Sequence, residues 1–261
     1  MTTLPTSVTE VIEVLGALPG VVAVVLGGSR AQGMSDPGTD WDLGLYYRST
    51  IDLSPLAAFG TIHPPGSWGR IMNGGAWLTR GSERIDVLLR DLDVVDHWTR
   101  LAERGQFERD ALLGYLAGIP TYVLTAELAS GQTLAGALPP PPRFPARLAE
   151  AAPPVWRFCR SFSLDYARMH ARRGNVAGAV GQAAAAAMEE AHAILCERGE
   201  WICNEKRLLA AAGLGSIQGL FPGAPAEPEA LVGWVDRIAA ALQGVRPPAV
   251  RSESTTSPAA P

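Results

Sequence analysis

The pattern of hydrophobic and polar positions predicts a series of short elements at the start of the chain. Apolar residues recur at helical spacing over residues 8–20, which predicts a helix that ends at Pro19-Gly20. The continuous apolar run VVAVVL, residues 21–26, is typical of a strand that is buried on both faces. After a Gly-Gly-Ser turn and a short helix start in residues 29–33, WDLGLYYR in residues 41–48 predicts a second strand.

The next segments predict a hairpin followed by helices. AWLTR (residues 76–80) and RIDVLLR (residues 84–90) read as its strands, and Gly81-Ser82 forms the turn. Residues 91–135 are predicted to be mainly helical, with an irregular patch at residues 118–122.

A proline-rich stretch, LPPPPRFP, divides the chain, because consecutive prolines cannot continue a helix or a central strand. We therefore predict an α+β protein: a domain of strands and helices in residues 1–136, a linker in 137–146, a helical domain in 147–245 and a disordered tail in 246–261.

Two helices of the second half have distinct faces. Around residues 155–173, one side collects apolar residues and the opposite side collects arginines; the apolar set is Val155, Phe158, Cys159, Phe162, Tyr166 and Met169. A core face and a solvated face explain this pattern, and a basic wall facing an anionic ligand is the alternative. Over residues 176–195 an alanine-rich stripe predicts close helix packing, with Glu190 at its margin and Glu189 pointing away.

Composition narrows the class of protein. The 261 residues are 47 % hydrophobic and 18 % charged, which is globular composition. The net charge of −4 argues against a duplex-DNA binder that works through bulk phosphate attraction. The start of the chain does not resemble a signal peptide, and no apolar run is long enough to cross a membrane. The three cysteines lack metal or redox spacing, so we expect reduced thiols in a cytoplasmic protein.

The chemistry centres on three aspartates. Asp40 and Asp42 are two residues apart on a predicted strand, so their side chains share one face, with Cα atoms about 6.5–7 Å apart. Asp86 interrupts the apolar pattern of a later strand. If the two strands are neighbours, three carboxylates converge, and Mg²⁺ is the hard cation that such a cluster binds.

The Gly-Gly-Ser turn supplies groups for an anion. Gly28 lets a phosphate approach the backbone, the following helix start favours negative charge, and Ser29 offers a hydroxyl. Arg30 is either a second phosphate donor or a surface residue. Trp68 and Trp77 fit core positions, with stacking on a base or sugar as the alternative, and His63 could line a cleft.

These residues together resemble the DNA polymerase β-like nucleotidyltransferase superfamily. The match consists of Gly28-Ser29, Ser35-Asp36, Asp40-x-Asp42 and Asp86 within residues 21–90. The spacing and the local sequence are most similar to those of small bacterial aminoglycoside, lincosamide and minimal nucleotidyltransferases. The resemblance implies that the first domain is a short mixed sheet flanked by helices. It further implies a nucleoside triphosphate donor, with ATP expected, whose phosphates are held by Gly28 and Ser29. It also implies two Mg²⁺ ions on Asp40 and Asp42, with Asp86 as third ligand or as base.

The resemblance extends only loosely to the helical half. In some relatives a glutamate there acts as base, and Glu190 is the candidate here. Lys206, the only lysine, could close over the triphosphate together with Asn204 and Arg207; a helix cap followed by a solvated first turn is the alternative.

The predicted activity is transfer of a nucleoside monophosphate to an acceptor hydroxyl with release of pyrophosphate. The acceptor is expected to be a small molecule, such as an antibiotic. A regulator that adenylylates a protein, a non-catalytic nucleotide-binding module and an RNA-modifying transferase are the alternatives. We expect no membrane or duplex nucleic acid partner, and whether two chains form a homodimer stays open.

Overall fold

The computed structural model describes residues 4–31, 33 and 38–244, and these form two compact units. The first consists of Met1–Ala152 together with Trp201–Glu205, and the second of Pro153–Glu200 and Lys206–Pro261. The sequence suggested a boundary at residues 137–146, whereas the units divide a few residues later, inside a helix. Ser35, Asp36 and the tail from residue 246 lie outside the described residues.

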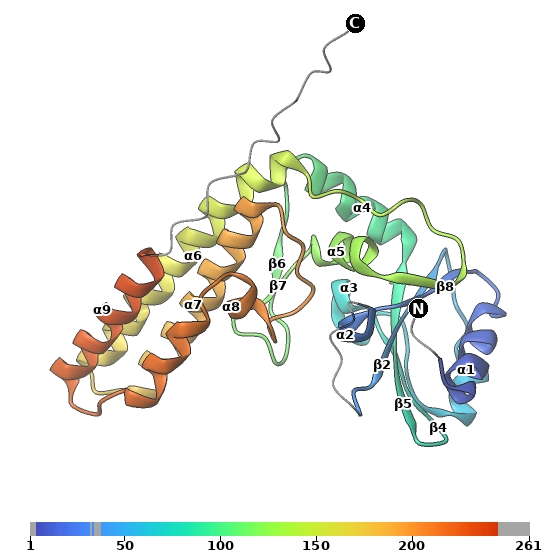
Figure 1. The fold of residues 1–261 in the computed structure, drawn as a ribbon, viewed down its shortest axis with the longest axis horizontal. Coiled ribbons are helices and arrows are strands. Elements are labelled where there is room, and N and C mark those ends of the chain that lie inside the picture. The colour runs from blue at the N-terminus through green and yellow to red at the C-terminus, as the bar shows by residue number, and fades with distance from the viewer. Residues whose placement is uncertain (1–3, 32, 34–37, 245–261) are drawn as a thin grey trace, which may run out of the picture. The chain divides into compact units, whose positions relative to one another are not determined.

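A six-stranded mixed sheet forms the centre of the first unit (Figure 1). Its order is β3-β4-β5-β2-β1-β8, and only β2 and β5 pair in parallel; the other pairs are antiparallel. The strands are β1 (Val21–Leu26), β2 (Trp41–Tyr47), β3 (Gly60–His63), β4 (Gly75–Arg80), β5 (Glu83–Asp91) and β8 (Gln132–Gly136). The predicted α+β class and mixed sheet are confirmed.

Helices cover both faces of this sheet. On one face α1 packs against the odd-numbered positions of β2, such as Leu43 and Leu45, in a fully buried core. On the other face α4 and α5 pack around Tyr46 and Val25. The helical and short elements of the unit are α1 (Thr6–Gly16), α2 (Gly28–Ala31), η1 (Ser54–Ala58), α3 (Gly69–Met72), α4 (Leu92–Glu103), β6 (Arg109–Asp110), β7 (Ile119–Pro120) and α5 (Val123–Ser130).

The local predictions hold for β1, β2 and the β4–β5 hairpin, which form where the apolar pattern placed them. The prediction of a mainly helical segment from 91 to 135 is only partly right. Residues 104–122 contain no helix, and β8 adds an edge strand to β1. Both β3 and β8 were missed because they are short edge strands with mostly polar or small residues.

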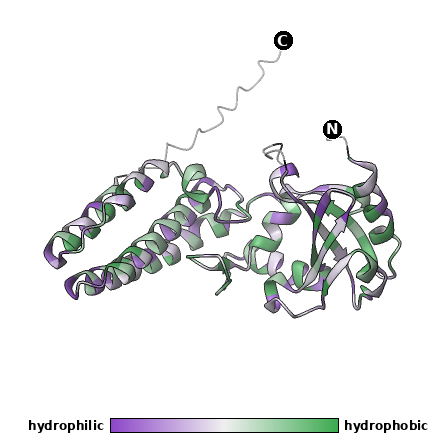
Figure 2. Cartoon of the chain, turned by 90° about the horizontal axis from the view of Figure 1, so that it is seen from below, coloured by the Kyte–Doolittle hydropathy of each residue, from purple (hydrophilic) through white to green (hydrophobic). Residues whose placement is uncertain are grey.

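The second unit consists of helices that each carry hydrophobic and hydrophilic residues (Figure 2). They are α6 (Ala146–Arg172, which begins in the first unit), α7 (Val176–Arg198), α8 (Leu208–Ala211), η2 (Gly215–Gly223) and α9 (Pro228–Gln243). Small side chains such as Ala167 and Ala187 are fully or almost fully buried here, so the helices approach closely.

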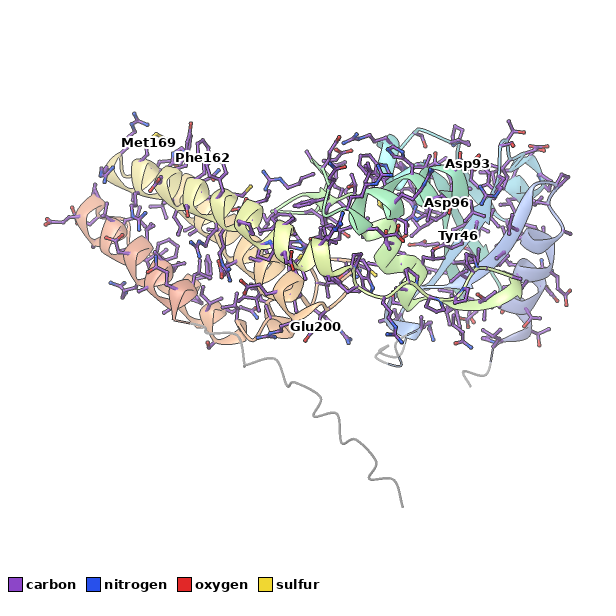
Figure 3. The ribbon with its side chains drawn as sticks, turned by 90° about the horizontal axis from the view of Figure 1, so that it is seen from above. Tyr46, Asp93, Asp96, Phe162, Met169 and Glu200 are labelled. Atoms are coloured by element: carbon purple, nitrogen blue, oxygen red, sulfur yellow. The ribbon has the colours of Figure 1, made fainter. Side chains whose placement is uncertain are left out.

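The core face of α6 is not the apolar stripe that the sequence suggested. Phe158 is 71 % exposed and Phe162 55 % exposed, whereas Trp156 and Ala167 are buried. Figure 3 shows Phe162 and Met169 on the side of α6 that faces away from α9.

The reason lies on α7, whose glutamates are buried and need partners. Glu190 forms ion pairs with Arg157 and Arg160 at 3.3 and 2.6 Å. Glu189, which the sequence placed on the solvent side, is 4 % exposed and accepts a hydrogen bond from Ser163 at 2.8 Å. The arginine side of α6 therefore turns inward, and the aromatic stripe turns outward.

Within the described residues, none of the helices combines the length and the apolar character needed to cross a membrane. The three cysteines are all described, and none of them forms a disulfide.

Candidate functional site

Asp42 and Asp86 lie side by side on the two central strands. They are direct partners in the parallel pairing of β2 and β5, so their Cα atoms are about 4.8 Å apart across the sheet. Both side chains project from the face that carries Tyr46, because Trp41 and Ile85 before them are buried on the opposite face. Both acids are only partly buried. The sequence could not fix this pairing, since it depends on a register between strands forty residues apart.

The Gly-Gly-Ser turn packs against the carboxylate of Asp42. The backbone N–H of Gly27 donates a hydrogen bond to the carbonyl oxygen of Asp42 at 2.8 Å. A Cβ atom on Gly28 would lie 1.9 Å from Oδ2 of Asp42, closer than atoms can approach. Gly28 also has a φ of +60°, in the left-handed region. The turn and the carboxylate therefore form one local arrangement that requires glycine at position 28.

The helix that follows the turn is short. α2 spans Gly28–Ala31, which is a single turn, and Ser29 lies inside it rather than before it. The helix start that was expected to favour negative charge is thus a single turn in the described residues, and its dipole adds little to anion binding. The backbone at Gly28 and the partly buried Ser29 are what the turn offers to a ligand.

Asp40 takes part in a different interaction. It precedes β2, and its Oδ1 atom forms an ion pair with Nε of Arg84 at 2.7 Å. Across residues 4–31, 33 and 38–244, no three His, Cys, Asp or Glu side chains gather closely enough to hold a metal ion. The structure thus describes an adjacent pair, Asp42 and Asp86, instead of the converging trio that the sequence suggested.

Arg30 is held by protein groups. Its guanidinium donates hydrogen bonds to the carbonyl oxygens of Thr39 and Asp40, the latter at 3.3 Å, and lies 4.0 Å above the ring of Trp41. These contacts tie the start of α2 to the segment that leads into β2. They support a positioning role for Arg30 that neither of the two sequence alternatives described.

Two predicted residues belong to the second unit. Glu190 is buried, and both of its carboxylate oxygens accept hydrogen bonds from guanidinium groups of α6. Lys206 is exposed and follows directly after the segment Trp201–Glu205. Their roles as base and as phosphate contact stay predictions.

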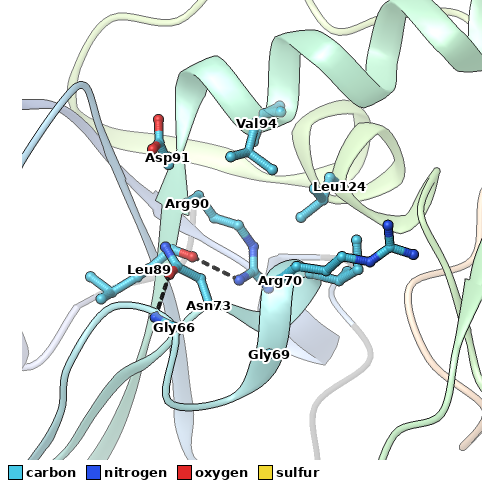
Figure 4. A pocket seen from close by; sticks show the side chains of 11 residues that line it. Gly66, Gly69, Arg70, Asn73, Leu89, Arg90, Asp91, Val94 and Leu124 are labelled. Carbon is cyan, nitrogen blue, oxygen red and sulfur yellow. Dashed lines mark hydrogen bonds between the residues drawn. The ribbon is translucent and has the colours of Figure 1, made fainter.

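A cavity of about 390 Å³ lies further along β5 (Figure 4). Its wall includes Asn73, Leu124 and the buried Arg90, whose guanidinium donates hydrogen bonds to both oxygens of Glu127. Arg90 is four residues beyond Asp86, or about 13 Å along the strand. Burial first, and then the charge of Glu127, raises the pKa of the neighbouring Tyr46 phenol above its usual value.

Comparison with known proteins leaves the family open. The chain matches no protein-family model and no curated protein. Among solved structures it is similar to a nucleotidyltransferase-like protein from Exiguobacterium sibiricum, with 12 % identity and a TM-score of 0.44, over 91 % of this chain and 73 % of that one. At this level of similarity, the function has to be argued from the site.

Proposed function

We propose that the protein is a nucleotidyltransferase that moves a nucleoside monophosphate from a triphosphate, with ATP expected, to an acceptor hydroxyl. One observation carries this proposal: Asp42 and Asp86 are paired in register on neighbouring strands, and Gly28 lies directly against the carboxylate of Asp42. Two adjacent carboxylates next to a glycine turn suit a substrate that is both anionic and metal-bound.

The turn is the proposed phosphate site. The space where a Gly28 side chain would lie is filled by the carboxylate of Asp42, so a phosphate would meet the backbone of the turn on its other side, where the hydroxyl of Ser29 is a further donor. Phosphates bound here would lie on the β1 side of Asp42, because Gly27 directly follows β1 and hydrogen bonds to Asp42.

The carboxylate pair fits Mg²⁺, which proteins commonly bind through one or two carboxylates, with water and substrate phosphates completing the shell. Asp42 and Asp86 would hold the ion, and Asp40 could join them by giving up its ion pair with Arg84. When bound, Mg²⁺ would neutralise charge that develops on the phosphates.

The proposed transfer is a displacement at the α-phosphorus. The acceptor oxygen forms a bond to the α-phosphorus, the bond from that phosphorus to the bridging oxygen breaks, and pyrophosphate leaves. The hydroxyl proton passes to a carboxylate or to water, and Asp86 is the proposed base because it is the acid further from the Gly28 turn.

The test compares Asp42→Asn and Asp86→Asn with Asp93→Asn, whose carboxylate is 65 % exposed and lies in a surface ion pair. Mn²⁺ serves as a spectroscopic substitute for Mg²⁺, and its binding in the presence of ATP is followed by electron paramagnetic resonance. We expect each site variant to bind Mn²⁺ at least about tenfold more weakly, in line with the loss of a charged ligand. Asp93→Asn should bind like the wild type.

The same proteins are then incubated with ATP labelled at the α-phosphate. Transfer of the label to an acceptor, with release of pyrophosphate, should be lost in both site variants. Undiminished Mn²⁺ binding in both would refute the metal-site assignment. Binding of ATP without pyrophosphate release under any condition would favour the non-catalytic alternative.

A further inference from the structure

An aromatic cluster occupies the sheet next to the carboxylate pair. It consists of His63 on β3, Trp68 just before α3, and Trp77 on β4. The His63 ring contacts both indoles, with ring centroids 4.8 Å from Trp68 and 4.3 Å from Trp77. The two indoles are stacked, with centroids 5.8 Å apart. Unlike a core cluster, it leaves Trp77 54 % exposed.

The cluster is held in place by the backbone around it. Gly75 leaves room for both the sheet and the cluster, since a Cβ atom there would lie 1.9 Å from the carbonyl oxygen of Val87 and 2.8 Å from Cζ3 of Trp68. Trp68 donates its backbone N–H to the carbonyl of Asn73 at 3.0 Å, and the Asn73 side chain accepts from Gly66 and donates to the hydroxyl of Tyr47, both at 2.9 Å. The indole of Trp68 therefore supports Trp77 from a fixed loop.

Strand register places Trp77 directly beside Asp86. The two are partners in the antiparallel pairing of β4 and β5, so their side chains project from the same face. Asp86 in turn is the partner of Asp42. Across this face the order is thus Trp77, Asp86, Asp42 and then the Gly28 turn, and Figure 1 shows β4, β5 and β2 side by side.

If the proposed function holds, this order places the triphosphate and the acceptor on opposite sides of the carboxylate pair. Displacement at phosphorus requires the attacking and leaving oxygens to lie roughly in line. With the triphosphate at the Gly28 turn, pyrophosphate leaves on that side and the acceptor enters from the side of Asp86 and Trp77. We propose that the exposed indole of Trp77 is the floor of the acceptor site, and that the acceptor carries its hydroxyl on or beside a ring with an apolar face.

The chemistry of the floor supports this class of acceptor. An indole offers a flat apolar surface that stacks on aromatic rings and on the C–H face of sugar rings. A hydroxyl on such a ring would lie next to Asp86, which is the proposed base. An acyclic hydroxyl, such as that of a serine side chain, would leave the indole uncovered and would gain little from it.

Binding is tested with three hydroxyl probes: methyl β-D-glucopyranoside, N-acetyltyrosinamide and, as the acyclic control, N-acetylserinamide. The indole N–H signal of Trp77 is identified in a ¹H–¹⁵N spectrum by its loss in Trp77→Phe. We expect at least one ring probe to shift this signal at concentrations where N-acetylserinamide does not. If neither ring probe shifts it, the proposal is overturned. A larger shift with the glucoside indicates a sugar ring in the acceptor, and a larger shift with N-acetyltyrosinamide indicates an aromatic ring.

Kinetics separates this proposal from the proposed function. With labelled ATP and the ring probe that binds, Trp77→Ala should raise the acceptor KM at least tenfold and leave the KM for ATP unchanged, while Trp77→Phe retains most of the affinity. Phe158→Ala, which removes a 71 % exposed aromatic from the other unit, is the control and should change neither constant. Transfer with an unchanged acceptor KM in Trp77→Ala would overturn the acceptor floor but leave the nucleotidyltransferase standing. A shifted Trp77 signal without any transfer by the wild type would leave the ring site standing and overturn the chemistry.

Discussion

Replacing Gly28 by alanine should destabilise the first unit, and the cost should depend on Asp42. A left-handed backbone conformation costs an L-residue about 1–2 kcal/mol, and Gly28 has a φ of +60°. In addition, the new Cβ would lie 1.9 Å from Oδ2 and 2.8 Å from Cγ of Asp42, so the carboxylate must move. Overpacking of this kind adds about 1–3 kcal/mol. The total expected loss is therefore about 2–5 kcal/mol.

A double-mutant cycle isolates the contact. Asp42→Ala removes Oδ2 and Cγ but keeps Cβ, which lies 3.2 Å from the position that the new methyl group at residue 28 would take. In that background Gly28→Ala should cost only the backbone contribution of about 1–2 kcal/mol, which leaves a coupling of about 1–3 kcal/mol between the two sites.

The assay is thermal or urea unfolding of the full chain, in which 1 kcal/mol corresponds to about 2–4 °C for a domain of this size. Gly114→Ala is the matched control: its φ is +81°, and no atom lies within 4 Å of the added methyl group. Its cost should be the same in both backgrounds. If Gly28→Ala costs as much with Asp42→Ala as without it, the turn does not contact the carboxylate and the argument for a combined site is refuted.

Two further predictions concern charged groups of the first unit. Glu127→Gln leaves the guanidinium of Arg90, which is 1 % exposed, without its charged partner and should lower the free energy of unfolding in urea by about 3 kcal/mol. As the control, Glu10→Gln in the pair with Arg80, which is about half exposed, should lower it by less than about 1 kcal/mol. Equal losses in the two variants would contradict the argument from burial. The hydrogen bond from Arg70 lowers the pKa of Asp110, so this pair stabilises the fold above the usual carboxyl pKa and loses its effect as the pH falls through the lowered value. Asp110→Asn should therefore lower the urea midpoint at pH 7 and match the wild type at about pH 2; a constant difference would show that the charge is not involved.

The sequence predicted those parts of the fold and site that depend on local patterns. β1, β2 and the β4–β5 hairpin each carry their own periodicity and turn residues, so they were found within a residue or two. Asp42 and Asp86 were singled out because each interrupts an apolar strand. Gly28 was singled out as part of the Gly-Gly-Ser turn, for the approach of a phosphate, whereas its contact with the carboxylate of Asp42 emerges only from the fold.

The remaining features depend on partners that are distant in the sequence. The side of α6 that turns inward is set by Glu189 and Glu190 of α7, whose burial a helical wheel of α6 alone cannot reveal. The same holds for Asp40, which the spacing placed with Asp42 but which pairs with Arg84 of β5. The sequence favoured a core position for Trp77, but this residue is exposed. Its exposure follows from the place of β4 near the edge of the sheet, where only β3 lies beyond it, and the sequence pattern of β4 alone does not reveal that place.

The short segment Trp201–Glu205 has a consequence for how the molecule can be divided. The carboxylate of Glu205 accepts hydrogen bonds from the N–H groups of Leu116 and Ala117 at 2.7 and 2.8 Å, and Cys203 lies 3.3 Å from the hydroxyl of Ser130. The sheet unit is therefore completed only by residues that the ribosome adds after the α6–α7 hairpin. A fragment that ends at the proline-rich stretch would lack residues 201–205. We therefore expect it to be less stable than a variant in which the α6–α7 hairpin is removed and residues 201–205 are retained.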